Sequence, residues 1–266
     1  MVMQNILWKH ILAVRAHAPL VHNITNHVVM NNTANALLAI GASPIMAHAR
    51  QEMDEMVALS HVLVVNIGTL DEVWVDSMLQ AARQAQILNK PWILDPVGAG
   101  ATSYRDQVLM QLIALRPTAI RGNASEILAL AHANRSQIKG VDSTAQSQEA
   151  LAAAQTLHEQ TGAVVGISGA TDFIVSDQPV VQVHNGTPLM TRVTGLGCTA
   201  TALIGAFLAV VENKTEAMVA ATALLSVAGE IAEKISSGPG SLQMNLLDKL
   251  YNLTASEFEN SLRIEF

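Results

Sequence analysis

The stretch "HVLVVNIGTLDEVWVDSMLQAARQAQILNKPWILDPVG", residues 61–98, holds two short apolar runs on either side of a longer helical pattern. The runs, residues 62–65 and 92–94, are continuously apolar, which is typical of strands covered on both faces. The segment between them repeats apolar residues at helical spacing. Strand, helix and strand in this order predict a βαβ unit and therefore a parallel sheet.

The same alternation runs through much of the chain. Residues 171–190 break it, because short strands joined by turn-prone residues predict a hairpin at the edge of the sheet. Helices then dominate to the C-terminus. We therefore expect an α/β fold with a mostly parallel central sheet and helices on both faces. The other short runs that each precede a helical pattern are "PLVHNI" (19–24), "SPIMAH" (43–48), "TAIRGN" (118–123) and "AVVGISG" (163–169).

No linker, low-complexity tract or internal repeat interrupts the sequence, so residues 1–266 are expected to form a single domain. Residues 1–20 predict an amphipathic helix and not a signal peptide, because charged residues interrupt the apolar run. The longest apolar stretches, residues 202–211 and 217–229, are shorter than the roughly 18 residues of a membrane span. They predict buried helices or subunit contacts.

One more helix is predicted within residues 26–42, "NHVVMNNTANALLAIGA". We expect Thr25 or Asn26 to cap its N-terminus, because both side chains can accept a hydrogen bond from a free helix N–H group. Gly41 is expected to close it. Small and apolar residues on more than one face indicate that this helix is buried, against the core or against another subunit.

The composition excludes some classes of partner. The chain carries a formal net charge of −7, and no run of Lys or Arg is present. A protein needs clustered cationic side chains to bind nucleic acids or anionic membranes, so neither is an expected partner. A single cysteine cannot form an internal disulfide, which favours a reducing compartment, and we expect the protein in the cytoplasm.

Acidic side chains follow two of the predicted strands. Asp95 ends a strand, where a parallel sheet presents functional groups, although an aspartate that caps the next turn is the alternative. Glu126 stands three residues after Asn123, a capping-box spacing that needs no substrate. Together with Arg121, the two carboxylates also suit a Mg²⁺-bound triphosphate.

The glycine-rich stretch "TRVTGLGCTATALIGAF", residues 191–207, contains the only cysteine, Cys198, where a glycine turn leads into a predicted helix. The free N–H groups and the positive dipole end of a helix form an anion site. Gly195, Gly197 and Ala200 also fit the dinucleotide fingerprint G-x-G-x-x-A. A dinucleotide-binding loop belongs to a strand-helix-strand unit, however, and neither a good strand before it nor a βαβ unit after it is predicted.

Other catalytic motifs are absent from the sequence. It contains neither a phosphate-binding G-x-x-x-x-G-K-[ST] loop nor a G-x-S-x-G nucleophile turn. The nine histidines show no metal-ligand spacing with cysteine, so transition-metal catalysis is not expected.

Six sequence blocks occur in this order: "PLVHNITNHVV", "GASPIMA", "NIGTL", "LDPVGAGAT", "AIRGNASEI" and "GLGC". Together they resemble the hydroxyethylthiazole kinase family of the ribokinase-like superfamily. They extend from about Pro19 to the helix after Cys198, and "GPGS" at 238–241 is also in place. The resemblance implies a ribokinase-like three-layer sandwich. It also implies ATP-dependent phosphorylation of the hydroxyl of 4-methyl-5-(2-hydroxyethyl)thiazole in thiamine salvage, by a homotrimer with active sites at subunit interfaces.

The resemblance also implies roles for particular residues. Ser168 stands where threonine is common, a change that keeps the hydroxyl group. Cys198 stands where the wider superfamily places a basic aspartate, and it is expected to be a weak base. Cys198→Ala should then reduce turnover by a modest factor, about 10² to 10⁴ at most, and Cys198→Asp should retain activity. The implied thiazole contacts are Met46, Gly195, Gly68 and Asn23, the ATP contacts Arg121, Ser168 and Asn123, the Mg²⁺ ligands Asp95 and Glu126, and the catalytic residues Cys198, Gly195 and Gly197.

Three other functions stay open on the sequence alone. The glycine run could serve an oxidoreductase that binds NAD(P). The pocket could belong to a thiazole-binding protein without activity, although such a protein has no use for a Mg²⁺-phosphate apparatus. A hydroxymethylpyrimidine kinase is the nearest alternative in the superfamily, and the blocks "PLVHNITN" and "GLGC" favour the thiazole.

Overall fold

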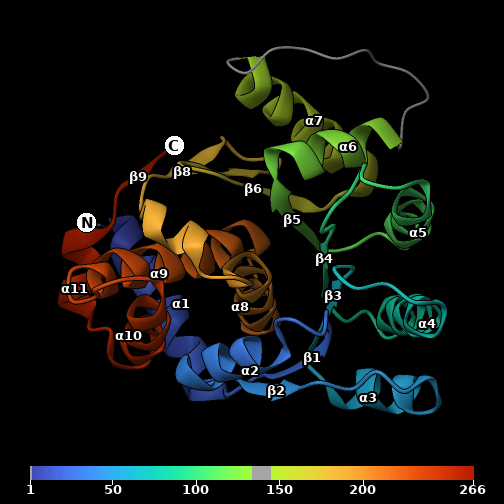
Figure 1. Cartoon of the computed structure of the whole chain (residues 1–266), viewed down its shortest axis with the longest axis horizontal. Coiled ribbons are helices and arrows are strands. Elements are labelled where there is room, and N and C mark those ends of the chain that lie inside the picture. The colour runs from blue at the N-terminus through green and yellow to red at the C-terminus, as the bar shows by residue number, and fades with distance from the viewer. Residues whose placement is uncertain (1, 134–144) are drawn as a thin grey trace.

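The computed structural model describes residues 2–133 and 145–266, and a nine-stranded sheet runs through this part of the chain (Figure 1). The strand order is β2-β1-β3-β4-β5-β6-β7-β8-β9. Strands β1 to β6 are parallel, and β7, β8 and β9 continue the sheet antiparallel. The strands are β1 (Leu20–Ile24), β2 (Ser43–Ile45), β3 (Val62–Asn66), β4 (Trp92–Asp95), β5 (Ala119–Asn123), β6 (Val164–Ser168), β7 (Asp172–Val175), β8 (Val181–Val183) and β9 (Ile264–Glu265).

Helices cover both faces of the sheet, as the continuous apolar strands predict (Figure 1). Successive residues of β3 belong to opposite cores: Val62 and Val64 pack in one, Leu63 and Val65 in the other. The first core is closed by α1 (Val2–His17), α2 (Met30–Ala39), α8 (Leu196–Val210), α9 (Lys214–Glu233), α10 (Pro239–Asn252) and α11 (Ala255–Ser261). The second is closed by α3 (Met53–Leu59), α4 (Glu72–Ile87), α5 (Ser103–Ile113), α6 (Ala124–Ala133) and α7 (Ala145–Thr161).

Helices α8 and α9 form the interior of the first layer. Helix α9 is long and apolar enough to span a membrane by length and composition, but 78% of its most apolar window is buried within the protein. Both helices are rich in alanine, which allows close packing between helices. The two apolar stretches are therefore buried helices, as predicted.

The fold confirms most of the expected elements, corrects two of them and adds one strand. The run at 163–169 is β6, but it leads directly into the hairpin β7–β8 and not into a helix. The short strand β9 at the C-terminus was not predicted, because two residues carry no periodic signal. Helix α2 begins at Met30 with Val29 as its N-cap, so neither Thr25 nor Asn26 caps it. Gly41 follows the helix with a positive φ of 87°, as a closing glycine should.

The sheet register brings polar side chains together at the carboxyl ends of the strands. Asn66 of β3 pairs with Asp95 of β4, and Asn123 of β5 pairs with Ser168 of β6. The N-terminus of α8 lies at this same edge, because Thr201 in its second turn bonds to Asp95. Two short 3₁₀ helices, η1 (Arg50–Glu52) and η2 (Pro188–Arg192), complete the chain's path, and η2 leads into α8.

Candidate active site

A cavity of about 720 Å³ opens at the carboxyl ends of the central strands. This volume is within the range of about 300–1,000 Å³ of small-molecule sites. Eight of the predicted site residues line it, and Met46, Gly68 and Asn23 do not. The eight are Asp95, Arg121, Asn123, Glu126, Ser168, Gly195, Gly197 and Cys198.

The start of α8 has the features of an anion-binding site. Gly195 is its N-cap, with φ of 80° in the left-handed region. The first intrahelical bond comes from the Thr199 N–H group to the Gly195 carbonyl, so the three preceding amides of the turn have no helical partner. The Arg121 guanidinium donates to the Gly197 carbonyl at 2.9 Å. Free amides and a cation therefore face one small volume, where phosphate groups bind well.

Asp95 lies beside this turn with only 2% of its surface exposed. One carboxylate oxygen, Oδ2, accepts hydrogen bonds from Asn66 Nδ2 at 2.7 Å and from Thr201 Oγ1 at 2.9 Å. Burial raises the pKa of Asp95 to about 6, although the charge of Arg121 and these hydrogen bonds oppose the rise. The carboxylate is ionised at neutral pH and attracts a cation strongly.

Two buried asparagines connect Asp95 to Cys198. Asn26 Nδ2 donates to Asn66 Oδ1 at 2.9 Å and to the Cys198 sulfur at 3.4 Å. This role of Asn26 was not predicted, because Asn26 was expected to cap a helix. Gly68 makes room for it, because a Cβ at Gly68 would lie 2.6 Å from Asn26 Nδ2. The structure therefore gives Gly68 a packing function next to the cavity.

Cys198 is a thiol and not a thiolate at neutral pH. Burial and the nearby charge of Asp95 raise its pKa to about 11, and hydrogen bonds from Asn66 and Asn26 only partly offset this. Its place at the start of a helix does not overcome these effects. The sulfur is well placed to contact a substrate, but it holds its proton.

Glu126 and Asn123 form the capping box that their spacing predicts. The Glu126 N–H group donates to Asn123 Oδ1 at 2.9 Å, and the Asn123 N–H group donates to Glu126 Oε2 at 2.8 Å. The other oxygen, Oε1, accepts from the Gly98 N–H group at 3.0 Å. Both residues thus have a structural function, which also fixes the Glu126 carboxylate at the cavity wall.

The far end of the cavity is formed by residues that the sequence did not single out. Residues 185–187, between β8 and η2, and Pro188 at the start of η2 make one wall, and α9 contributes Thr222, Leu225 and Ser226. Asp172 of β7 also lines the cavity, and burial raises its pKa despite the charge of Arg121. Residues 185–188 and α9 contribute no charged side chain to the lining, whereas the wall at α8 lies beside Arg121 and Asp95, so the two walls differ chemically.

Met46 and Asn23 lie outside this cavity, near the edge strand β2. Met46 directly follows β2 and is half-buried. Asn23 is fully buried, with its Nδ2 donating to the Val21 carbonyl at 3.0 Å and its Oδ1 without a hydrogen bond from the described residues. Two histidines nearby, His22 and His48, also each keep one buried ring nitrogen that has no hydrogen-bond partner in the part of the chain that the structure describes. Unpaired buried polar atoms favour a second binding surface here.

Comparison with known proteins decides the family. A model described as the hydroxyethylthiazole kinase family matches residues 11–256. The chain belongs to this family. It is 55% identical to a hydroxyethylthiazole kinase of Syntrophus aciditrophicus over 97% of this chain and 96% of that protein. The structure of the hydroxyethylthiazole kinase protein from Pyrococcus horikoshii OT3 superposes with a TM-score of 0.91 at 38% identity, covering 98% of both chains.

A ribokinase-like superfamily protein from Enterococcus faecalis shares the fold at 16% identity, with a TM-score of 0.60 over 87% of this chain and 86% of that one. The fold also removes the dinucleotide alternative, since Gly195 follows η2 and α8 leads into α9, so the motif is not part of a βαβ unit. The chain is a kinase with ATP as co-substrate.

Gly195→Ala should disrupt this site. A Cβ there would lie 2.5 Å from a Val29 methyl group, and the φ of 80° strains any residue with a side chain. We expect the melting temperature to fall and kcat/KM to fall by about 10²-fold, the size of losing one oriented backbone donor. Gly240→Ala is a matched control, because nothing lies within 4 Å of the Cβ it would add. Equal activity of the two variants would contradict this account of the turn.

Proposed function

We propose that the cavity is the nucleotide half of an active site in which the chain phosphorylates the hydroxyl of 4-methyl-5-(2-hydroxyethyl)thiazole, the reaction of its family in thiamine salvage. The observation that supports this most is the meeting of Arg121, Asp95 and the first amides of α8 at one wall of the cavity. In this proposal the described elements are parts of one domain, residues 1–266, which works in the cytoplasm.

The triphosphate of ATP would lie at the charged end. Arg121 and the first amides of α8 would neutralise charge on the terminal phosphate as its bond to ADP breaks and a bond to the substrate oxygen forms. Asn123 and Ser168 line the same stretch of the cavity and are assigned to the nucleotide. The base and ribose would extend toward residues 185–188 and α9.

The residues present fit a magnesium ion. Mg²⁺ binds to proteins through one or two carboxylates and completes its shell with phosphate oxygens and water. Asp95 is buried, ionised and keeps one oxygen, Oδ1, without a hydrogen bond from the described residues, and Glu126 adds a second carboxylate at the cavity wall. These two residues would hold the ion. When bound, it would neutralise charge on the phosphates.

The thiazole would bind between Gly195 and a surface near Met46. Met46, Asn23 and Gly68 do not line the cavity, so in this proposal a neighbouring subunit completes the thiazole site. Several apolar side chains near this edge are exposed, among them Val28 at 62% and Leu38 at 58%. These features support a homotrimer with active sites at subunit interfaces. Light scattering on the purified protein gives the number of subunits directly.

Cys198 would contact the reacting hydroxyl. Because its pKa is about 11, the thiolate is scarce at pH 7, and a loose transition state asks little of a base. Cys198→Ala should therefore lower kcat by no more than about 10²-fold, the lower end of general base catalysis, and Cys198→Asp should retain activity. The pH profile between 7 and 9 should be the same in the wild type and in Cys198→Ala. A folded, ATP-binding Cys198→Asp enzyme without activity would exclude this role.

The proposal is tested by a coupled assay of ADP release with ATP, Mg²⁺ and the thiazole alcohol. ADP release should need both the thiazole and the metal, and hydroxymethylpyrimidine should not replace the thiazole. Bound thiazole without turnover would instead indicate a binding protein without activity. Stoichiometric NAD(P) binding without ADP release would indicate an oxidoreductase.

A further inference from the structure

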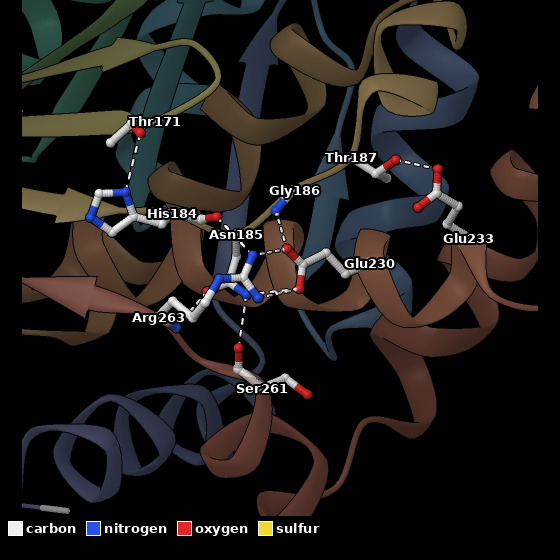
Figure 2. Close-up of polar contacts among 9 residues, drawn as sticks. All are labelled: Thr171, His184, Asn185, Gly186, Thr187, Glu230, Glu233, Ser261 and Arg263. Carbon is white, nitrogen blue, oxygen red and sulfur yellow. Dashed lines mark hydrogen bonds and ion pairs between the residues drawn. The ribbon is translucent and has the colours of Figure 1, made fainter.

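The wall of the cavity between β8 and η2 is held by a cluster of polar contacts away from the reacting groups. Asn185, Gly186 and Thr187 belong to this wall. Figure 2 shows that each is tied to α9 or to the C-terminal segment. The ties come from Glu230 and Glu233, and from residues 261–263 just before β9.

Glu230 is the centre of the cluster. Its carboxylate accepts from Asn185 Nδ2 and from the Gly186 N–H group, both at 2.9 Å. It also forms an ion pair with both terminal nitrogens of the Arg263 guanidinium (Figure 2). Only 16% of the Glu230 side chain is exposed, against 55% for Arg263. Burial opposes ionisation of Glu230, but the bonds from Arg263, Asn185 and Gly186 outweigh it and lower its pKa. A charged, bidentate pair of this kind fixes geometry as well as distance.

The C-terminal segment completes the attachment. The Arg263 N–H group donates to Asn185 Oδ1 at 2.7 Å, and its guanidinium donates to the His184 carbonyl at 2.8 Å. Asn185 Nδ2 also donates to the Ser261 carbonyl at 2.9 Å. Asn185 is almost fully buried. Both polar atoms of its side chain form hydrogen bonds, to Glu230 of α9 and to residues 261 and 263 near the end of the chain.

The next part of the wall packs directly on α9. Thr187 donates a hydrogen bond to Glu233, one turn after Glu230. Met190 lies against Gly229 so closely that a Cβ on that glycine would lie 2.4 Å from its sulfur. The wall is thus fixed at three successive points, and α9 itself lines the cavity one and two turns earlier, at Ser226 and Thr222.

We propose that Glu230, together with Arg263 and Asn185, is a positioning unit for ATP: it holds residues 185–190 in the shape that receives the base and ribose. The proposal rests on the nucleotide assignment made above. Glu230 does not line the cavity and lies outside the phosphate end, so it acts through the wall and not on the phosphoryl group. When the wall is formed only part of the time, the apparent Kd for the nucleotide equals the intrinsic Kd divided by the fraction of molecules in which the wall is formed.

The test compares wild type, Glu230→Gln and Arg263→Gln in steady-state kinetics and in calorimetric titration with ADP. We expect KM for ATP and Kd for ADP to rise about ten-fold, as they would if the wall were formed a tenth of the time. The kcat value and KM for the thiazole should stay within about two-fold, since neither depends on the wall once ATP is bound. Arg263→Lys, which keeps the charge but not the bidentate geometry, should restore part of the affinity.

Glu257→Gln is the matched control. Glu257 pairs with Lys249 at 2.9 Å and caps α11, but it does not line the cavity. A similar rise in KM for ATP in this variant would overturn the proposal, because it would show a general loss of stability. An unchanged Kd for ADP in folded Glu230→Gln would also overturn it. Failure of the wild type to bind ADP would instead refute the nucleotide assignment. If Glu230→Gln does not fold, the result for Arg263→Gln decides whether the proposal holds. Arg263 is more exposed than Glu230, and its replacement leaves the hydrogen bonds from Asn185 and Gly186 to Glu230 in place.

Discussion

Asp95→Asn should reduce kcat by about 10³-fold, as expected for loss of one charged group that stabilises the transition state. Asparagine has nearly the same shape, and its oxygen can still accept the hydrogen bonds from Asn66 and Thr201. The variant therefore removes the charge and little else. The coupled ADP assay measures the loss, and higher Mg²⁺ should recover little activity, because the amide is a poor replacement for the carboxylate.

The same substitution should make the folded state more stable at neutral pH. The pKa of Asp95 is 3.8 in its reference state and about 6 in the folded chain, so the folded state binds this proton more tightly. Its contribution to stability is present below pH 3.8 and is lost as the pH rises through 6. At 1.36 kcal/mol per pKa unit, ionised Asp95 costs about 3 kcal/mol at most at pH 7.5.

Thermal unfolding without nucleotide and with EDTA checks this effect. Asp95→Asn should melt above the wild type at pH 7.5, and the difference should shrink toward pH 4. A variant that melts below the wild type at pH 7.5 would contradict the assignment of Asp95 as a buried charge kept for function.

Arg121→Gln should reduce kcat/KM for ATP by about 10³-fold or more, the range reported for arginines that neutralise a transferring phosphate. The guanidinium donates to the Gly197 carbonyl, and its charge lowers the pKa values of Asp95 and Asp172, so glutamine removes the cation beside the first amides of α8. Arg121→Lys should recover only part of the activity, since lysine lacks the planar fork.

Arg83→Gln is the control for charge alone. Arg83 is exposed on α4, on the opposite layer, and its replacement should leave the kinetics within about two-fold, as for ordinary surface substitutions. Activity of Arg121→Gln within ten-fold of the wild type would mean that the phosphate does not bind at α8.

The fold was largely predictable because its strands are continuous apolar runs that are followed by helices. Functional groups gather at the carboxyl ends of parallel strands, and this rule selected Asp95 as a candidate. Asn66 pairs with Asp95 at the end of β3, so the same rule could have selected Asn66 as well. The capping box at Asn123 was also predictable, because both partners lie within four residues.

The features that could not be predicted depend on contacts between residues far apart in the sequence. Asn26 was expected to cap a helix, but its amide instead bonds to Asn66 and Cys198, 40 and 172 residues away. Glu230 and Arg263 are 33 residues apart, and nothing in their local pattern indicates a pair. Such partners are brought together only by the packing of α9 and β9 around the hairpin.

The most direct test of the account is a crystal structure of the protein with ADP and the thiazole alcohol. The account predicts the β-phosphate at the first turn of α8 beside Arg121, and the base against residues 185–190. It also predicts the thiazole hydroxyl near Cys198, with Met46 of a neighbouring subunit completing its site. A nucleotide bound elsewhere, with the α8 turn free of phosphate, would contradict it.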